Sequence, residues 1–371
     1  MKLTITRETL LRPLKAALPS TDVSAKTLPI LTHFLLDYQA PPVLTITATD
    51  TGAEYHAVTE TESSGTPGQI CAPAKKLMDI IRLLPEQADV KIDLRGERLH
   101  VTAGRSRFTL ATLPAGSFPA FDRDAMVHRI TVNARLLRRA LDAVAPASGI
   151  GDVRGYLNGT LLRLADGELA LVASDGHRIA RWVIPDIPEP PCGRIDAIMP
   201  RQSAIDIARS LRDATGDVAL SFSPRSLSVG LDTDTYSTRL IEGRYADYQR
   251  MIPTAFATEI RCGRACLLAA LQRIGAVAGD RRGMELAVSD EGVALSGHSE
   301  DREQADEEID ATVTGLTGDV RRYGLNLDYL ASSLGQISGD TADLHFSETG
   351  MCVVTGESEP HYLGLVAPMR L

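Results

Sequence analysis

Apolar residues recur at helical spacing in two stretches of the chain that resemble one another. Intervals of three and four residues place such positions on one side of a helix. The pattern therefore predicts two amphipathic helices, over 7–17 and 135–145, each with one face packed against its domain. Similar stretches predict further helices over 73–84, 200–213, 264–274 and 326–337. The two apolar faces consist of Leu10, Leu11, Leu14 and Leu18, and of Leu136, Leu137, Leu141 and Val144.

Between the predicted helices, apolar and polar residues alternate. Alternation with a period of two is typical of strands that bury one face. Turn signals such as Asp166-Gly167 and Asp290-Glu291-Gly292 separate the runs. About eight strands and two helices then recur along the chain, which indicates an α+β fold with helices on one side of antiparallel sheets. The clearest runs are 43–49, 90–94, 98–102, 108–113, 169–173, 218–222 and 227–231.

The same order of elements occurs three times. Residues 3–11, 130–137 and 260–268 each read as a short strand followed by a helix. A second landmark, at Pro73, Pro200 and Asn326, recurs at intervals of 127 and 126 positions. Two landmarks that share one period indicate repeated domains, and 371 residues are too many for one core. We expect three similar domains over 1–126, 127–255 and 256–371.

Composition narrows the class of protein. The chain is 44% hydrophobic and 23% charged, and it has no run of about 18 apolar residues that would cross a membrane. Its start, Met1–Thr6, lacks the pattern of a signal peptide, so we expect a cytoplasmic protein. The five cysteines form no CxxC pair and no tetrad with histidine at zinc spacing. We therefore expect mostly buried, reduced thiols, with neither a metal nor a cofactor.

Charge is distributed unevenly between the helices and the rest of the chain. The six predicted helices hold 14 basic and 6 acidic residues, a net charge of +8, although the whole chain carries −9. One interpretation is that these are ordinary solvated helix faces. The other is a shared basic surface that neutralises phosphates without reading bases. Aromatic residues are only 5% of the chain, so binding of single strands by stacking is not favoured.

Ordered sequence blocks are spread along the whole chain. They are TLPIL (27–31), PAKK (73–76), GRSRF (104–108), TLPA (112–115), DVRGYLNG (152–159), SDGHRIA (174–180), GRYADY (243–248) and PMRL (368–371). Together these blocks resemble the β-subunit family of bacterial DNA polymerase III, the sliding clamps. The resemblance implies three clamp-type domains per chain and a head-to-tail dimer that forms a closed ring, with helices lining the hole. It implies a non-catalytic processivity factor that encircles duplex DNA and tethers the polymerase.

The resemblance also implies partners and a pocket for short peptide motifs. The partners are duplex DNA, the polymerase III α subunit, the clamp-loader complex, and other polymerases and repair proteins that carry a clamp-binding motif. Ala246 stands where the family commonly has proline, and Ala367 where methionine is expected, which softens the pocket. Carried over by motif, the pocket comprises Leu157, Ser174, Gly176, His177, Arg178, Ile179, Ala246, Arg250, Met251, Leu365, Val366, Ala367, Pro368, Met369 and Arg370.

Two other readings of the chain stay open at this point. Ser174, Asp175 and His177 could be imagined as the nucleophile, acid and base of a hydrolase, although no Gly-x-Ser-x-Gly elbow surrounds Ser174. Asp175-Gly176 also reads simply as a tight turn. The other reading is a clamp-like scaffold that has lost ring closure and only binds peptides.

Residues for DNA contact and for dimer contact follow from the family motifs and from helix placement. At the contact between copies, Lys76 and Phe108 should face Ala276 and Val277. The acidic run 300–308 is most simply a solvated outer surface. The candidates for DNA contact are Lys26, Lys75, Lys76, Arg82, Arg138, Arg139, Arg154, Tyr156, Arg201 and Arg209.

Overall fold

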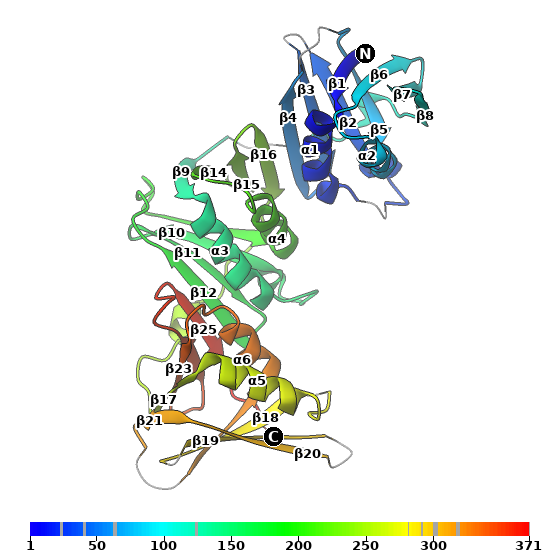
Figure 1. The fold of residues 1–371 in the computed structure, drawn as a ribbon. Helices are drawn as coiled ribbons and strands as arrows, with labels where there is room; N and C mark the ends of the chain where they lie inside the picture. The colour runs from blue at the N-terminus through cyan, green and yellow to red at the C-terminus, as the bar shows by residue number, and fades with distance from the viewer. Residues whose placement is uncertain are drawn as a thin grey trace. The chain divides into compact units, whose positions relative to one another are not determined.

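The computed structural model describes residues 1–22, 25–39, 42–61, 65–122, 125–280, 282–290, 292–299, 303–316 and 320–370. Helices and strands follow one another in the same order in each third of the chain (Figure 1). The first third contains β1 (Lys2–Thr6), α1 (Arg7–Ala17), β2 (His33–Gln39), β3 (Val43–Thr49), β4 (Ala53–Glu60), β5 (Gly68–Pro73), α2 (Ala74–Leu83), β6 (Asp89–Arg95), β7 (Arg98–Ala103) and β8 (Ser106–Ala111).

The second and third repeats keep this order. The second contains β9 (His128–Asn133), α3 (Ala134–Val144), β10 (Gly159–Ala165), β11 (Glu168–Ser174), β12 (Arg178–Ile184), β13 (Arg194–Pro200), α4 (Arg201–Ser210), β14 (Asp217–Phe222), β15 (Ser226–Leu231) and β16 (Asp234–Arg239). The third contains β17 (Thr258–Gly263), α5 (Arg264–Gly275), β18 (Gly283–Ser289), β19 (Gly292–His298), β20 (Gln304–Ile309), β21 (Ala311–Thr314), β22 (Arg321–Asn326), α6 (Leu327–Leu334), β23 (Thr341–Phe346), β24 (Cys352–Thr355) and β25 (Tyr362–Val366). The predicted α+β repeat is therefore confirmed.

The chain folds into two compact units, each of which spans a junction between repeats. One unit comprises Met1–Arg138 with Asp206–Leu240, and the other comprises Arg139–Ile205 with Ile241–Leu371. In the first unit, an eight-stranded sheet has the order β5-β2-β3-β4-β16-β15-β14-β9. In the second, a nine-stranded sheet has the order β13-β10-β11-β12-β25-β24-β23-β17-β21. A strand of one repeat thus pairs with the last strand of the next, as β4 pairs with β16 and β12 with β25.

Each unit also contains a separate four-stranded sheet. The order is β1-β6-β7-β8 in the first unit and β20-β19-β18-β22 in the second. In these two sheets β8 and β20 lie at an edge and have a strand neighbour on one side only. Edge strands present unpaired N–H and C=O groups, so β8 and β20 are free to accept a further strand.

The helices bury part of the predicted apolar stripe, whereas Leu11 and Leu18 are half-buried. The side chains of Leu10 and Leu14 on α1 are completely buried, and α1 packs beside α2 as α5 packs beside α6 (Figure 1). The expectation that Leu136 faces the core is wrong, because 44% of its surface is exposed whereas Leu137 is 1% exposed. The buried stripe of α3 runs from Leu137 through Ala140 and Leu141 to Val144, and this leaves position 136 beside the stripe.

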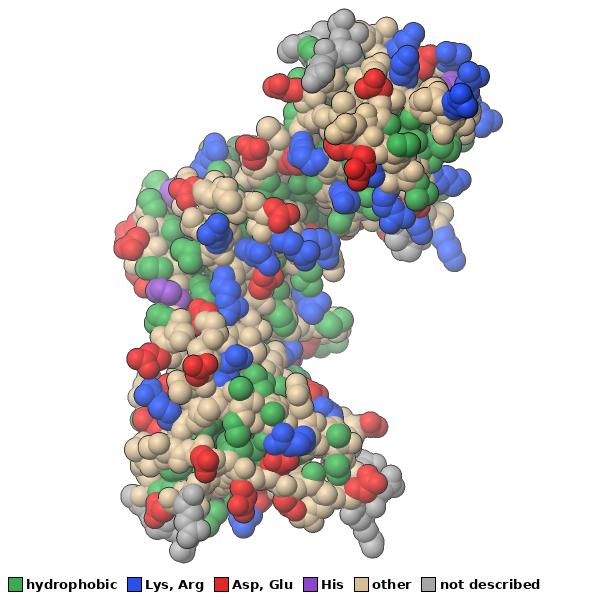
Figure 2. Space-filling view, in the orientation of Figure 1, with side chains coloured by type: hydrophobic (Ala, Val, Ile, Leu, Met, Phe, Trp, Pro, Cys, Tyr) green, Lys and Arg blue, Asp and Glu red, His purple; other side chains and the backbone are tan. Residues whose placement is uncertain are grey.

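Basic side chains are unevenly distributed among the helices. Figure 2 shows Lys and Arg gathered over α3 and α4, whereas α5 and α6 present mainly hydrophobic and neutral groups. α3 carries three arginines, α4 and α5 carry two each, and α6 carries none. The basic surface expected from the sequence is therefore missing at α6. Within the described ranges, no helix is long and apolar enough to cross a membrane.

Candidate functional site

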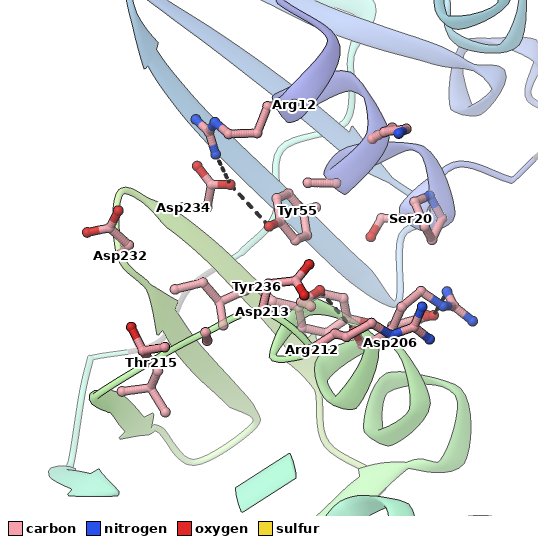
Figure 3. A pocket seen from close by; sticks show the side chains of 18 of the residues that line it. Arg12, Ser20, Tyr55, Asp206, Arg212, Asp213, Thr215, Asp232, Asp234 and Tyr236 are labelled. Atoms are coloured by element: carbon pink, nitrogen blue, oxygen red, sulfur yellow. Dashed lines mark hydrogen bonds and ion pairs between the residues drawn. The ribbon is translucent and has the colours of Figure 1, made fainter. Parts of the chain in front are cut away.

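A polar cavity of about 790 Å³ lies in the first unit between α1 and the segment that follows α4 (Figure 3). Four basic and five acidic side chains line it, so its net charge is small. Asp206 accepts a bond from Arg209 Nη1 at 2.7 Å, and Asp234 accepts one from Arg12 Nη1 at 3.0 Å. Both carboxylates are buried and already paired. The cavity therefore has no excess charge to select a ligand.

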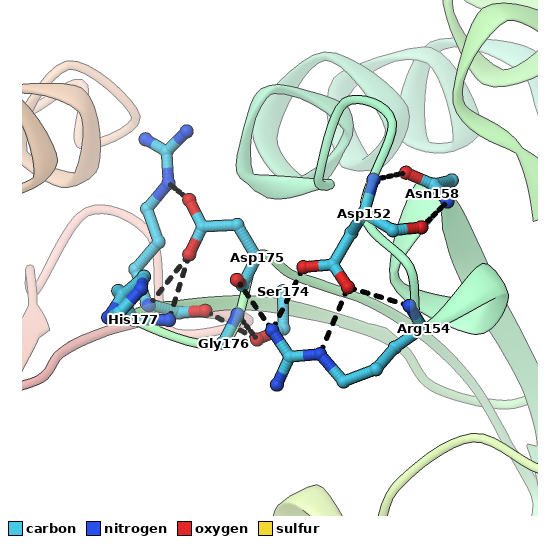
Figure 4. A network of polar contacts seen from close by, with 8 residues as sticks. Asp152, Arg154, Asn158, Ser174, Asp175, Gly176 and His177 are labelled. Atoms are coloured by element: carbon cyan, nitrogen blue, oxygen red, sulfur yellow. Dashed lines mark hydrogen bonds and ion pairs between the residues drawn. The ribbon is translucent and has the colours of Figure 1, made fainter.

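The turn at 174–178 is held by its own side chains (Figure 4). Ser174 Oγ donates to the Arg178 carbonyl at 2.7 Å and accepts the Gly176 N–H at 3.1 Å. Asp175 Oδ1 accepts the backbone N–H groups of His177 and Arg178 at 3.0 and 3.1 Å. The hydroxyl and the carboxylate thus close a turn, and within the described part of the chain neither is hydrogen-bonded to the exposed His177 side chain. This arrangement supports the tight-turn interpretation and gives no support to a catalytic triad.

A second turn, at 152–158, is closed by an aspartate and an arginine (Figure 4). Arg154 Nε and Nη2 donate to the two carboxylate oxygens of Asp152 at 3.0 and 2.9 Å. Asp152 Oδ1 also accepts the Arg154 N–H at 2.8 Å. These hydrogen bonds from the Arg154 side chain and backbone lower the pKa of Asp152 to about 2. The loop that was expected to touch DNA is therefore ordered by its own ion pair.

The two turns meet at Gly176. Its φ of +90° lies in the left-handed region that glycine tolerates best, and a Cβ placed there would lie 2.6 Å from Arg154 Nη2. Arg154 Nη2 also lies 3.5 Å from the Asp175 carbonyl oxygen. The absence of a side chain at 176 therefore lets the guanidinium of Arg154, from the turn at 152–158, lie against the turn at 174–178. Arg178 completes the arrangement, with its guanidinium 4.6 Å from the ring centroid of Tyr329 on α6.

An apolar cluster lies beside these turns. It joins residues from β10, β11, β12, β13 and β25 to Tyr245 and Tyr248 from the segment after β16. The pairing of β12 with β25 places Ile179 opposite Leu365 and Arg178 opposite Val366. The buried members are Leu161, Val172, Ile179, Ile198, Tyr245, Tyr248, Val353 and Leu365, and Tyr156, Ile241, Ile252, Met351 and Leu363 pack against them.

Two of the predicted pocket residues, Ile179 and Leu365, belong to this cluster. The Ala367 N–H donates to the His177 carbonyl at 2.9 Å, which ties the segment after β25 to the turn at 174–178. Leu157 and Val366 are buried, and Ser174 is 6% exposed. Ala246, Arg250 and Met251 flank the buried Tyr248. The half-buried residues are Gly176, Arg178, Ala246, Ala367 and Met369, and the exposed ones are His177, Arg250, Met251, Pro368 and Arg370.

The end of the chain leaves this cluster. The Met369 N–H donates to the Gly324 carbonyl at 2.8 Å, on β22. Met369 and Arg370 line a separate cavity of about 290 Å³ together with Met284 and His298. The last two predicted pocket residues therefore lie beside a different hollow of the same unit.

Sequence reasoning missed several residues of the cluster. Tyr245 and Tyr248 provide two of its largest side chains, and the ring of Tyr156 meets that of Tyr245 edge-on with centroids 5.5 Å apart. Burial raises the pKa of Tyr245. The signal was present, because both tyrosines lie within the block GRYADY. Met351, directly before β24, and Val353, on β24, had no such signal, since their segment matched no motif.

The DNA candidates differ in how free their side chains are. Arg154 is engaged with Asp152, Arg209 is paired with Asp206, and Arg138 Nη1 donates to the Arg212 carbonyl at 3.2 Å. Tyr156 is half-buried in the apolar cluster. Arg201 is half-buried, and among the described residues its Nε has no hydrogen-bond partner. The exposed candidates are Lys26, Lys75, Lys76, Arg82, Arg154 and Arg209.

Arg139 has a different environment. Its Nη1 donates to Gln336 Oε1 at 3.2 Å and its Nη2 to Glu359 Oε1 at 3.3 Å. The guanidinium also lies 5.1 Å from the ring centroid of Trp182. To bind a phosphate, Arg139 would have to give up these contacts. They indicate a role in holding the second and third repeats together.

The residues expected at the contact between copies lie on β8 and around two helices. Phe108 is half-buried on the edge strand β8, and Lys76 is exposed on α2. Ala276 is exposed and Val277 is half-buried directly after α5. The acidic run forms much of β20, with Asp306 and Glu308 exposed, while residues 300–302 fall outside the described ranges.

The chain was compared with known proteins. Its three parts match models of the N-terminal, central and C-terminal domains of the DNA polymerase III beta subunit over residues 1–122, 131–247 and 249–370. It is 33% identical to a beta sliding clamp of Pseudomonas aeruginosa and 30% identical to that of Escherichia coli strain K12, each over the full length of both chains.

Solved structures agree with these matches. A sliding clamp from Pseudomonas aeruginosa, crystallised with a ligand, superposes with a TM-score of 0.95 at 31% identity. A clamp of the same species bound to griselimycin gives 0.94 at 31% identity, and the polymerase III beta subunit of Caulobacter crescentus gives 0.92 at 32% identity. All of these cover the whole of both chains. The chain belongs to the family of DNA polymerase III beta subunits, the DNA sliding clamps, which are non-catalytic processivity factors in DNA replication.

Proposed function

We propose that two copies of the chain join head to tail and close a ring of six repeats around duplex DNA. The observation that carries this proposal is the equivalence of the strands at the repeat junctions. β4 and β12 pair with the last strands of the following repeats, β16 and β25. Their counterpart in the third repeat is β20, and the counterpart of β16 in the first repeat is β8. Both are edge strands, and a head-to-tail contact through them closes with two copies.

The register at this contact follows from the first unit. Gln304 occupies the same position in the hairpin of β19 and β20 as Glu54 does in the hairpin of β3 and β4. Ser106 occupies the same position in the hairpin of β7 and β8 as Asp234 does in the hairpin of β15 and β16. Transfer of the β4–β16 pairing then sets Asp306 opposite Arg107 and Ala305 opposite Phe108. Opposite charges that face each other across antiparallel strands stabilise the pair. Lys76, Ala276 and Val277 would border this contact.

The helices of the ring would face the duplex. Weak contacts with phosphates are independent of sequence and permit sliding, while closure of the ring retains the protein on DNA. The exposed residues Lys26, Lys75, Lys76, Arg82 and Arg209 are the candidates whose side chains can reach a phosphate without leaving a buried environment. Arg154 and Tyr156 would act through the loop at 152–158.

The cluster beside the turn at 174–178 would bind the short motifs of partner proteins. Its buried aliphatic and tyrosine side chains suit apolar anchors, while Arg178, Arg250 and the flexible Met251 lie where they can adapt to different sequences. The binding of griselimycin by a relative supports a ligand site on this fold. The partners would be the polymerase III α subunit, the clamp loader, and other polymerases and repair proteins. We place the domain boundaries near 126 and 255 and the protein in the cytoplasm.

Light scattering with charge-reversed variants tests the ring. The wild type should have twice the chain mass of 39.9 kDa at micromolar concentration. Arg107→Glu should weaken the dimer, and Asp306→Arg in the same chain should restore it, because the reversed charges again attract. A wild-type monomer would instead favour a peptide-binding scaffold without a ring. Failure of the second change to rescue the first would refute the proposed register.

A further inference from the structure

An arginine of α1 joins the first repeat to the second (Figure 3). Arg12 Nη1 donates to Asp234 Oδ2 at 3.0 Å, and its Nη2 donates to the Val58 carbonyl at 2.6 Å. Asp234 is 4% exposed, and its carboxylate also accepts the Tyr55 hydroxyl at 3.1 Å and the Val58 N–H at 3.0 Å. Asp234 begins the last strand of the second repeat, whereas its partners belong to the first. Three hydrogen bonds from the first repeat thus meet on one buried carboxylate of the second.

Arg139 makes the corresponding contact between the second and third repeats. It follows Arg12 by 127 positions, and the buried stripes of the two helices align at the same offset, as Leu10 with Leu137 and Leu14 with Leu141. Its acidic partner, Glu359, lies in the turn before β25, just as Asp234 lies at the start of β16. Both junctions within the chain therefore use an arginine at one helix position and a carboxylate on the last hairpin of the next repeat.

The two surfaces that would meet between copies lack this contact, because the third repeat has no arginine at the helix position and the first repeat has no carboxylate at the hairpin position. The matching position on α5 is Ala269, because Leu267 and Leu271 continue the same buried stripe. The arginine stands one turn later, at Arg273, and its Nε and Nη2 donate to Glu307 of its own repeat at 2.6 and 2.8 Å. On the first repeat, Ser106 holds the hairpin position of Asp234. The charge of α5 is thus used within its own repeat.

We infer that the Arg12–Asp234 and Arg139–Glu359 ion pairs hold the two junctions within the chain together, and we call each such pair a lock. The junction between copies has no lock, and can therefore open. The inference rests on the proposed head-to-tail ring. Separating the Arg12–Asp234 junction would leave a buried carboxylate without its arginine, which is strongly unfavourable, and separating the Arg139–Glu359 junction would break a half-buried pair. At the junction between copies the facing charges, Arg107 and Asp306, lie on exposed positions, and water can solvate them when the ring opens.

Installation of the missing lock tests this inference. The double variant Ala269→Arg with Ser106→Asp is compared with both single variants and the wild type, and subunit exchange between two fluorescently labelled dimer populations gives the dissociation rate. The double variant should exchange about tenfold more slowly than the single effects together predict, which corresponds to a coupling of about 1.4 kcal/mol. If the dissociation rate of the double variant changes only by the product of the two single effects, the proposed lock is overturned. A wild type that forms no dimer would overturn the ring as well.

Removal of a natural lock gives an independent test that does not depend on folding of the double variant. Arg139→Gln should accelerate amide hydrogen exchange in β12 and β25 while the dimer dissociation rate stays that of the wild type. Arg135→Gln, on the exposed face of the same helix, is the matched control and should leave both unchanged. Unchanged protection of β12 and β25 in Arg139→Gln, or faster subunit exchange without loss of that protection, would overturn the inference.

Discussion

The substitution Gly176→Ala should weaken partner binding, because the added methyl group would displace the Arg154 guanidinium. Gly176 has a φ of +90°, and its new Cβ would lie 2.6 Å from Arg154 Nη2 and 3.1 Å from Nη1. The backbone penalty for alanine in this region is about 1 kcal/mol. The Asp152–Arg154 pair is exposed and screened by solvent, so its loss adds little to this penalty. The expected loss of stability for Gly176→Ala is therefore about 1–2 kcal/mol.

Gly151→Ala is the matched control. Gly151 has a φ of +67°, and a Cβ there would meet nothing within 4 Å, so this variant has the backbone penalty without the contact. Urea unfolding should show a similar loss for both variants. Fluorescence anisotropy with a labelled clamp-binding peptide should show weaker binding, by roughly threefold to tenfold, only for Gly176→Ala, since a change of 1.4 kcal/mol is tenfold.

The coupling to Arg154 gives two further readouts. Gly176→Ala in an Arg154→Ala background should recover part of the lost affinity, because the contact is gone. In Gly176→Ala itself, the pKa of Asp152 should rise from about 2 toward its ordinary value of 3.8 as the guanidinium is displaced. Equal peptide affinities for Gly176→Ala and Gly151→Ala would refute the reasoning.

Three other changes test the rest of the structure. Asp234→Ala should lower the free energy of unfolding by about 3–5 kcal/mol, because it leaves Arg12 and the buried Tyr55 hydroxyl without their acceptor. A loss below about 1 kcal/mol in urea unfolding would contradict a buried lock. The Asp152 carboxyl has a folded pKa below its unfolded value, so its contribution to stability is present above about pH 4 and disappears as the pH falls toward 2. An NMR titration midpoint near 3.8 for Asp152 would show that the Asp152–Arg154 pair is absent in solution. Leu365→Ala should cost about 2–5 kcal/mol and reduce peptide binding, and full retention of both would remove Leu365 from the cluster.

The helices and strands were largely predictable because their signals are local. The expected helix at 7–17 and strand at 43–49 match α1 and β3 residue for residue. Apolar spacing alone could not choose between Leu136 and Leu137, since a helix rotated slightly would bury either. The tertiary packing of α3 decides that Leu137 is buried.

Contacts between distant residues were not predictable from local pattern. Arg139 read as one more basic helix residue, yet its carboxylate partner, Glu359, lies 220 positions away. The contact of the Arg154 guanidinium with Gly176 depends on a backbone with positive φ at position 176, which no spacing rule specifies. The family motifs located the turn at 174–178 and the strand at 365–367, but the path of Met369 and Arg370 toward another cavity depends on a hydrogen bond to β22.

Retention on DNA tests the closed ring most directly. The labelled protein is loaded onto nicked circular duplex DNA with a clamp loader, and its dissociation is followed before and after a single restriction cut makes the DNA linear. A topological link predicts long retention on the circle at high salt, where phosphate contacts are weak, and rapid loss from the linear ends. Equal dissociation rates from circular and linear DNA would contradict the ring, because the protein would then be held by affinity alone.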